Sequence, residues 1–215
     1  MRAGVRTQTL ARYRSAPLGD RIHARVRDLT CPFLAVSAAV PRAGRVLEFG
    51  CGHGVASLLL ALDSSSREVV GVDIDKDKIA VASNAAEGLP NVGFEHRADG
   101  SFPPGEWDAV VFIDVLYLLG HDRAEAVLES AARSLRPGGV VVVKEIDLVP
   151  RWKYRWAKVQ ELAATRLFGI TEGDHVSFLP PDLIEAQLIA NGLHVRRRPA
   201  HRRSPWPHLI ITGSR

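Results

Sequence analysis

A glycine-rich turn between a strand and a helix constrains the fold of this 215-residue chain more than any other feature. Residues 46–57 read Val-Leu-Glu-Phe-Gly-Cys-Gly-His-Gly-Val-Ala-Ser, which predicts an apolar strand, a turn and the first residues of a helix. Gly50, Gly52 and Gly54 carry no side chain that would keep a ligand away from the backbone. The helix that follows points free N–H groups at the same place. The pattern therefore predicts a nucleotide-like ligand at this turn.

A carboxylate after the next apolar segment supports this interpretation. Asp73 stands 23 residues after Gly50, and a carboxylate at such a strand end can accept hydrogen bonds from both hydroxyls of a ribose. The glycine spacing also separates two classes of ligand. Dinucleotide sites need Gly-x-Gly-x-x-Gly, whereas Val55 stands at the third glycine position here. The pattern is instead acid-x-Gly-x-Gly-x-Gly, and its acid is Glu48.

The composition indicates one α/β domain of ordinary globular type, with 46% hydrophobic and 24% charged residues. No apolar stretch approaches the roughly 20 residues that span a bilayer. Residues 1–14 are basic without an apolar signal core, so we expect a cytoplasmic protein. Cys31 and Cys51 are the two cysteines, and Cys51 lies within the glycine turn. We therefore expect neither a disulfide nor a metal site.

The net charge of +4 is unevenly distributed along the chain. Residues 1–45 carry +7 and residues 151–215 carry +6, whereas residues 46–150 carry −9. One interpretation is that both basic ends lie over one face and attract an anionic substrate. The alternative is that these arginines are simply solvated.

Strand and helix patterns alternate through the middle of the chain, which predicts a parallel sheet covered by helices on both faces. Residues 1–44 lack strand patterning and predict a helical cap, in which Leu18, Ile22, Val26 and Leu29 recur at helical spacing. The expected strands are residues 45–49, 68–72, 92–95, 107–113 and 140–144, and the expected helices are residues 55–62, 76–86 and 123–135.

The pattern changes after residue 150, where we expect an inserted cap over residues 150–178. Residues 151–168 are basic and rich in tryptophan, which indicates a helix. The alternating cations and aromatics of residues 151–156 suit a nucleic acid, an anionic membrane surface or an anionic small molecule. Trp152 and Trp156 share one helical face and can equally fix the cap to the core. A helix over residues 180–190 and strands at 193–197 and 208–212 complete the prediction.

Five motifs in order resemble those of class I S-adenosylmethionine (SAM)-dependent methyltransferases, over roughly residues 44–147. Within this family the chain is broadly similar to the ubiquinone/menaquinone-biosynthesis type and to natural-product enzymes that act on small molecules. The motifs are the glycine turn with its preceding acid (48–54), Val-Asp-Ile-Asp (72–75), Ala-Asp-Gly (98–100), the strand and its end at 108–119, and the Leu-x-Pro-Gly-Gly turn at 135–139.

The resemblance implies a Rossmann-like three-layer sandwich, with a seven-stranded, mostly parallel sheet whose last strand is antiparallel. Residues 45–215 would form the cofactor-binding domain behind the cap. SAM would be the cofactor, S-adenosylhomocysteine the product, and no metal would be needed. Asp73 would hold the ribose, Ile74 would pack on the adenine, and Asp99 or its backbone would take the adenine amino group. The implied cofactor residues are Glu48, Gly50, Cys51, Gly52, Gly54, Asp73, Ile74, Asp99, Gly100 and Asp114.

Catalytic residues are harder to identify, because methyl transfer from a sulfonium is a direct displacement that depends mainly on alignment. A base is needed only where the acceptor must lose a proton. The candidates are Asp114, Glu145 and His175. Asp114 can equally contact the cofactor, Glu145 can orient a substrate or pair with a loop residue, and a lone histidine is more often structural. Candidate acceptor contacts are Tyr117, Trp152, Trp156 and His208.

Motifs that would specify other acceptors are missing. Ile-Asp-Val-Leu at residues 113–116 stands where base-methylating enzymes have Asn/Asp-Pro-Pro-Tyr, and no appended nucleic-acid-binding domain or acidic metal-ligand set is present. This favours a small-molecule acceptor. The methyl group can go to an oxygen, a carbon or a nitrogen atom of it. We expect the protein to be a monomer or a homodimer. The alternatives are an RNA or protein methyltransferase, a SAM-binding protein without turnover and, last, a nicotinamide-dependent oxidoreductase.

Overall fold

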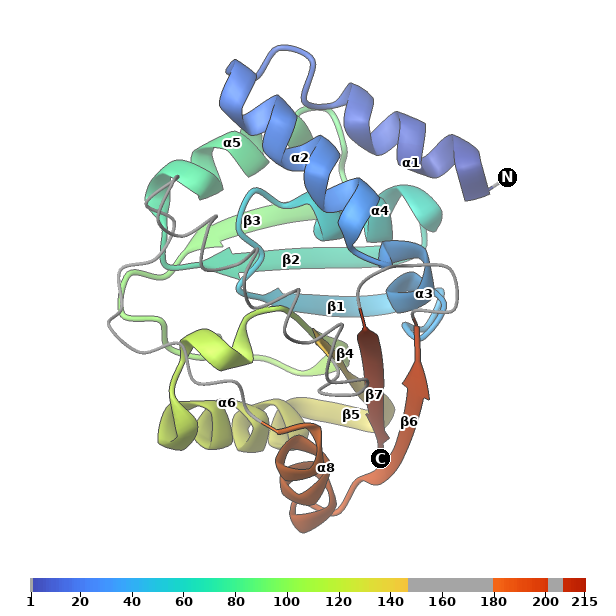
Figure 1. Ribbon diagram of the computed structural model, residues 1–215, viewed down its shortest axis with the longest axis vertical. Helices are drawn as coiled ribbons and strands as arrows, with labels where there is room; N and C mark the ends of the chain where they lie inside the picture. Colours follow the sequence, from blue (N-terminus) through green and yellow to red (C-terminus); the bar gives the residue numbers. More distant parts are fainter. Residues whose placement is uncertain (1, 147–179, 201–206) are drawn as a thin grey trace.

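The computed structural model describes residues 2–146, 180–200 and 207–215, and Figure 1 shows their arrangement. The helices are α1 (Arg2–Ala11), α2 (Leu18–Thr30), α3 (Phe33–Ser37), α4 (Val55–Asp63), α5 (Lys76–Ala86), the 3₁₀ turn η1 (Leu116–Leu118), α6 (His121–Ser134) and α8 (Pro181–Ala190). The strands are β1 (Gly44–Phe49), β2 (Arg67–Asp73), β3 (Val92–His96), β4 (Trp107–Ile113), β5 (Leu135–Ile146), β6 (His194–Pro199) and β7 (His208–Ser214).

The strands form one seven-stranded sheet in the order β3-β2-β1-β4-β5-β7-β6. Neighbours from β3 to β5 pair in parallel, whereas β7 is antiparallel to both β5 and β6. The last strand is therefore the antiparallel one, as the resemblance to class I methyltransferases implies. The central strands have continuous apolar runs because both of their faces are covered. In β4, Val110, Val111 and Phe112 are each 0% exposed.

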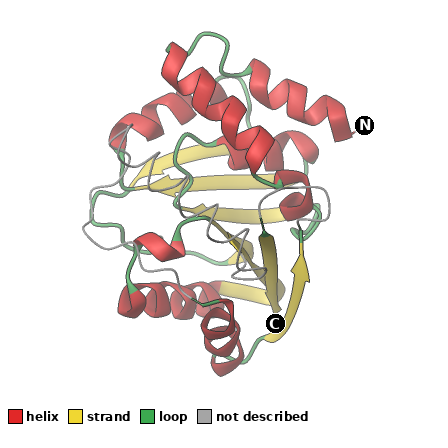
Figure 2. Cartoon of the chain, viewed as in Figure 1, coloured by secondary structure: helices red, strands yellow, loops and turns green. Residues whose placement is uncertain are grey.

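Helices lie on both faces of the sheet and make a three-layer sandwich (Figure 2). One core cluster joins the sheet to α6 and α8, and a second joins it to α4, α5 and the N-terminal helices. Tyr13, Phe33 and Val36 belong to this second cluster, and the N-terminal helices pack on α4, which separates them from the sheet.

Two local predictions differ from the structure. Residues 135–139 were expected as a turn, but they form the beginning of β5, where Leu135 pairs with Trp107 across an irregular register. Pairing with β4 resumes at Val140, which lies opposite Ala109, and between these two pairs Gly138 adopts a φ of +79° that suits glycine. The sequence predicts one or two helices in the cap, with an interruption at residues 31–32. The described residues form three, because residues 12–17 also separate α1 from α2.

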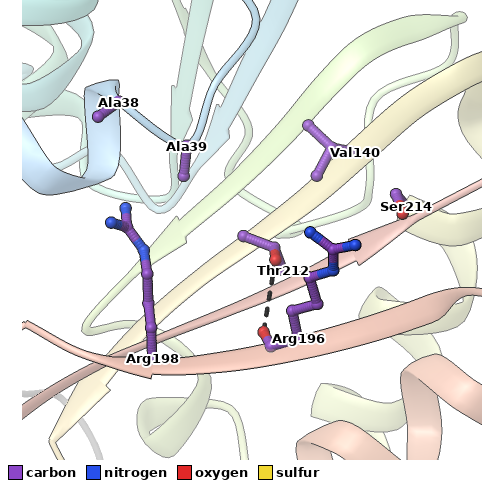
Figure 3. Close-up of a pocket in the computed structure, with 7 residues that line it drawn as sticks. All are labelled: Ala38, Ala39, Val140, Arg196, Arg198, Thr212 and Ser214. Atoms are coloured by element: carbon purple, nitrogen blue, oxygen red, sulfur yellow. Dashed lines mark hydrogen bonds between the residues drawn. The ribbon is translucent and has the colours of Figure 1, made fainter.

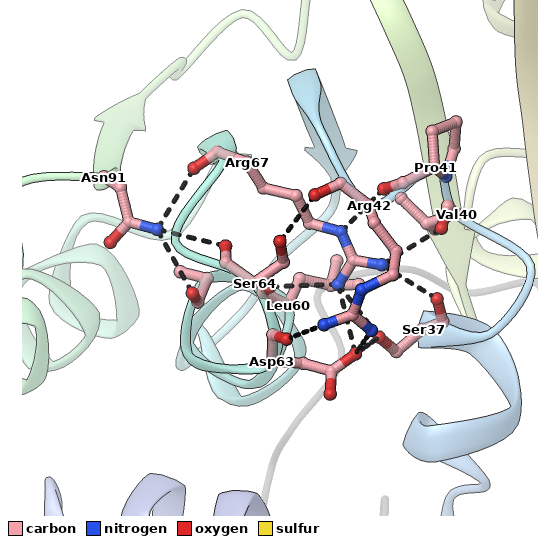
Figure 4. A network of polar contacts seen from close by, with 10 residues as sticks. Ser37, Val40, Pro41, Arg42, Leu60, Asp63, Ser64, Arg67 and Asn91 are labelled. Carbon is pink, nitrogen blue, oxygen red and sulfur yellow. Dashed lines mark hydrogen bonds and ion pairs between the residues drawn. The ribbon is translucent and has the colours of Figure 1, made fainter.

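A buried arginine connects the N-terminal segment to the core (Figure 4). The guanidinium of Arg67 is 0% exposed and donates all five of its N–H groups to hydrogen bonds of 2.7–3.0 Å. The acceptors are the carbonyls of Ser37, Val40, Pro41 and Leu60 and the hydroxyl of Ser37. One side chain thereby holds the end of α3, the loop before β1 and the end of α4 together.

Candidate cofactor site

Four strands place the candidate residues at one edge of the sheet. The glycine turn follows β1, Asp73 ends β2, Asp114 follows β4, and Glu145 lies near the end of β5. Because these strands are parallel and adjacent, their carboxyl ends meet at the edge where open α/β sheets bind ligands.

The glycine turn requires glycine at its three positions for different reasons. All three glycines have a φ between +53° and +76°. A Cβ at Gly50 would overlap the side chain of Val115, and a Cβ at Gly54 would overlap Phe94. A Cβ at Gly52 would meet nothing within 4 Å. Gly52 therefore faces open space, as a backbone approached closely by a ligand must.

Asp73 joins the end of β2 to this turn. Its Oδ2 accepts a hydrogen bond of 2.7 Å from the N–H of Gly52, and its Oδ1 accepts one of 2.9 Å from the N–H of Asp75. Each carboxylate oxygen can accept a further hydrogen bond. The side chain is half-buried, so it is oriented by the protein and still accessible to a ligand.

Glu48 is buried beneath the turn. It is 3% exposed, and its Oε2 accepts a hydrogen bond from the hydroxyl of Ser57 on α4. Burial raises the pKa of Glu48 to about 7, although the Ser57 hydrogen bond opposes the shift. The contact shows Glu48 anchoring α4 below the turn.

The raised pKa of Glu48 predicts a pH-dependent stability. Between about pH 4.5 and about pH 7 the folded protein binds a proton at Glu48 that the unfolded chain releases. Stability from this group is therefore lost as the pH rises through this window. Glu48→Gln keeps an acceptor for Ser57 and carries no proton that titrates. We expect its free energy of unfolding, relative to that of the wild type, to rise by about 3 kcal/mol between about pH 4.5 and about pH 7. Urea unfolding at several pH values measures the difference, and a difference independent of pH would contradict the assignment.

An apolar side chain and a short loop lie beyond Asp73. Ile74 is 63% exposed, and an exposed large apolar side chain at a site indicates a ligand-contact surface. A Cβ at Gly100 would lie 3.1 Å from Cγ2 of Ile74, which places the two residues side by side. The carboxylate of Asp99 is exposed and accepts a hydrogen bond from the N–H of Ser101, whereas its carbonyl accepts one from Arg123.

Asp114 is held by two cations. Arg27 of α2 pairs with its Oδ2 at 2.8 Å, and Lys144 of β5 pairs with its Oδ1. Burial opposes ionisation, but Lys144 and Arg27 outweigh it and hold the pKa of Asp114 well below its usual range. Among the described residues, Asp114 is the only one other than glycine with a positive φ, at +55°. The carboxylate is thus ionised, oriented and a weak proton acceptor.

The other described candidates surround this cluster. Glu145 is 5% exposed, and its Oε1 accepts a hydrogen bond of 3.3 Å from the N–H of Leu116 in η1. Tyr117 is half-buried in the same turn. His208 is 4% exposed and lies 2.6 Å from the carbonyl of Thr30. Burial, assisted by Lys144, lowers the pKa of His208 to about 3, so its imidazole is neutral at physiological pH.

Several residues at the site were not singled out from the sequence. The hydroxyl of Tyr13 donates to the carbonyl of His53 in the glycine turn at 2.6 Å. The His53 ring lies 4.1 Å from the His23 ring, and its Nε2 lies 3.2 Å from a carboxylate oxygen of Asp20. Arg27, like Asp20 and His23, belongs to α2. No local motif marks these residues, whereas Lys144, a charge within an apolar strand, was a visible signal.

Three candidates lie outside the described residues, as does the inserted cap at 150–178. These are the proposed catalytic His175 and the proposed acceptor contacts Trp152 and Trp156.

A cavity of about 440 Å³ lies elsewhere (Figure 3). It is lined by Arg196 and Arg198 of β6, with Thr212 and Ser214 of β7 across from them. Val140 of β5 also lines it and pairs with Ala109 near the start of β4. The cavity is therefore at the opposite edge of the sheet from the glycine turn.

Within the described ranges, no group of three or more His, Cys, Asp or Glu side chains is placed to hold a metal ion. None of the helices there is long and apolar enough to cross a membrane. Cys31 and Cys51 are both buried free thiols.

The fold is Rossmann-like, and the candidate residues lie together at the carboxyl ends of its parallel strands. A family model described as a methyltransferase domain matches residues 20–197. The chain belongs to this family of methyltransferase domains.

Individual relatives agree with this assignment. A fatty-acid O-methyltransferase of Mycolicibacterium smegmatis is 32% identical over 114 residues, which cover 51% of this chain and 40% of the relative. A trans-aconitate 2-methyltransferase of Methylobacterium nodulans is 33% identical over 123 residues, or 56% of this chain and 46% of the relative. The matches thus span less than half the length of these two relatives.

A solved structure shows the same fold. The SAM-dependent methyltransferase SibL in its apo form superposes with a TM-score of 0.73 at 24% identity. The superposition covers 92% of this chain and 58% of SibL.

Proposed function

We propose that this protein is a SAM-dependent methyltransferase that acts on a small-molecule acceptor. The observation that carries the proposal is the contact between Asp73 and the N–H of Gly52, at a turn position that is open to a ligand. This contact joins the two parts of the sequence that would hold a ribose and an amino-acid moiety. The family assignment and the names of the relatives support it.

The described residues suit SAM better than a dinucleotide. Asp73 would accept the ribose hydroxyls, Ile74 would cover one face of the adenine, and the loop at 99–100 would take its edge. Gly50, Cys51, Gly52 and Gly54 would line the amino-acid moiety. The carboxylate of Asp73 lies beside the open turn position, which favours a ligand with a sulfonium and an ammonium over a pyrophosphate.

Bound SAM would supply an electrophilic methyl group, and the protein would position the acceptor and exclude water. We assign Asp114 to positioning, because its pairing with Arg27 and Lys144 holds its pKa too low for a base. Glu145 would fix η1, and hence Tyr117, beside the acceptor. The neutral imidazole of His208 would border the same space.

A carboxylate is the acceptor group that this arrangement suits best. It is already ionised at neutral pH, so its methylation needs no base. The names of the two relatives, fatty-acid and trans-aconitate methyltransferases, point to carboxylic acids as well.

Calorimetry and a methyl-transfer assay test the proposal. We expect SAM and S-adenosylhomocysteine to bind and NADH not to bind. With radiolabelled SAM, fatty acids and trans-aconitate are the first acceptors to try, followed by phenols and amines. Binding of NADH without binding of SAM would overturn the proposal. Binding of SAM with transfer only to RNA or protein would overturn the small-molecule acceptor.

A further inference from the structure

Helix α2 turns its apolar side chains away from the protein. The apolar residues of α2 recur at the helical spacing that the sequence predicts, but their side chains are largely exposed to solvent. On the other side of the helix, Ala24 and Asp28 are 0% and 8% exposed. An amphipathic helix at the surface of a globular protein normally shows the reverse orientation. The exposed side chains, called the α2 stripe below, are Leu18, Ile22, Val26 and Leu29, at 67, 54, 50 and 70% exposure.

Polar contacts on the inner face fix this orientation. Arg27 pairs with Asp114 at 2.8 Å, and Asp28 accepts a hydrogen bond of 2.7 Å from Arg6 of α1. Asp20 contacts His53 in the glycine turn. A rotation of α2 that buried the stripe would break all three contacts. Figure 1 shows α2 as an outer helix lying across α4.

The charges on the two faces of α2 are also segregated. Arg21 and Arg25 are exposed beside the stripe, and Arg14 is exposed just before the helix begins. Both acidic residues of α2, Asp20 and Asp28, make the inward contacts described above. The outer face of α2 therefore combines large apolar side chains with positive charge and no negative charge.

We propose that the α2 stripe docks on an anionic lipid bilayer, with the helix lying in the plane of the interface. Such a surface buries apolar side chains at the boundary of the acyl chains and attracts flanking arginines through its headgroups. A second copy of this chain fits less well. A symmetric pairing through the stripe would bring Arg21 and Arg25 against the same residues of the other copy, with no acid on this face to compensate.

The docking surface lies on the same helix as part of the candidate site. Arg27 and His23 on the inner face contact Asp114 and the His53 ring. Docking through the outer face would therefore bring the site next to the lipid. The inference rests on the placement of α2 and on its charges, and it does not depend on the proposed reaction.

Vesicle flotation tests the proposal. We expect the wild-type protein to float with vesicles of equimolar phosphatidylcholine and phosphatidylglycerol, and not with phosphatidylcholine alone. Changing Ile22→Ser and Val26→Ser together should lower binding at least about tenfold, because the apolar contact is lost. Changing Arg21→Gln and Arg25→Gln together should lower binding by about the same factor. The matched control is Ile189→Ser on α8, where an isoleucine is 60% exposed and binding should not change.

Each competing explanation gives a different result. Wild-type protein that does not float, or a serine double variant that floats like wild type, would overturn the proposal. A wild-type dimer that the serine substitutions convert to a monomer, measured by sedimentation without vesicles, would assign the stripe to a second copy instead. A large drop in the thermal midpoint of the same variant without vesicles would show that the chain itself covers the stripe.

Discussion

Replacing Asp73 by alanine should raise the dissociation constant for SAM about 100-fold. The side chain would form two charge-assisted hydrogen bonds to the ribose, each worth about 1.5–3 kcal/mol. It also orients Gly52 through the hydrogen bond of 2.7 Å. Loss of about 3 kcal/mol corresponds to the expected factor. Isothermal titration with SAM measures the change, and thermal unfolding without ligand shows whether the variant is folded.

Two further variants separate ligand binding from the geometry of the turn. Asp73→Asn keeps an oxygen for the N–H of Gly52 but loses the charge, so we expect a loss of about tenfold. Asp75→Ala removes the N-terminal cap of α5, where Asp75 accepts from the N–H groups of Asp77 and Lys78. That change should lower stability by about 1 kcal/mol without changing SAM affinity. Wild-type affinity in Asp73→Ala would refute the ribose assignment.

The elements that the sequence predicts well are those with local signals. Alternating apolar segments predict the sheet, and the helix at 76–86 and the strand at 107–113 have their predicted bounds. The glycine turn also carries a local signal, because all three of its glycines have a positive φ. Asp73 lies beside the turn because adjacent parallel strands end at the same edge of the sheet.

What escapes prediction depends on residues that are distant in the sequence. Arg27 meets Asp114 across 87 positions, and Tyr13 meets the carbonyl of His53 across 40. Periodicity also says which side chains of α2 share a face without saying where that face points. The polar side of α2 faces the protein because Arg27 pairs there with Asp114 and Asp20 contacts His53.

Replacing Arg67 by methionine should lower the free energy of unfolding by about 3–5 kcal/mol. Methionine fills part of the volume but leaves the carbonyls of Ser37, Val40, Pro41 and Leu60 buried without this donor. Each buried acceptor that loses its partner costs about 1–3 kcal/mol, less what the structure recovers by relaxing. At about 2–4 °C per kcal/mol for a chain of this size, the thermal midpoint should fall by about 10 °C.

The controls for Arg67 distinguish the five-bond geometry from the charge. Arg67→Lys keeps the charge but cannot form the planar fork, so it should be destabilised nearly as much as the methionine variant. Arg133, 74% exposed and paired with Glu129 on α6, provides the surface comparison, and Arg133→Met should change stability by less than about 1 kcal/mol. If the lysine variant were as stable as wild type, the charge alone would hold α3 and α4 together. If the methionine variant were also as stable, apolar packing alone would attach the N-terminal helices to α4.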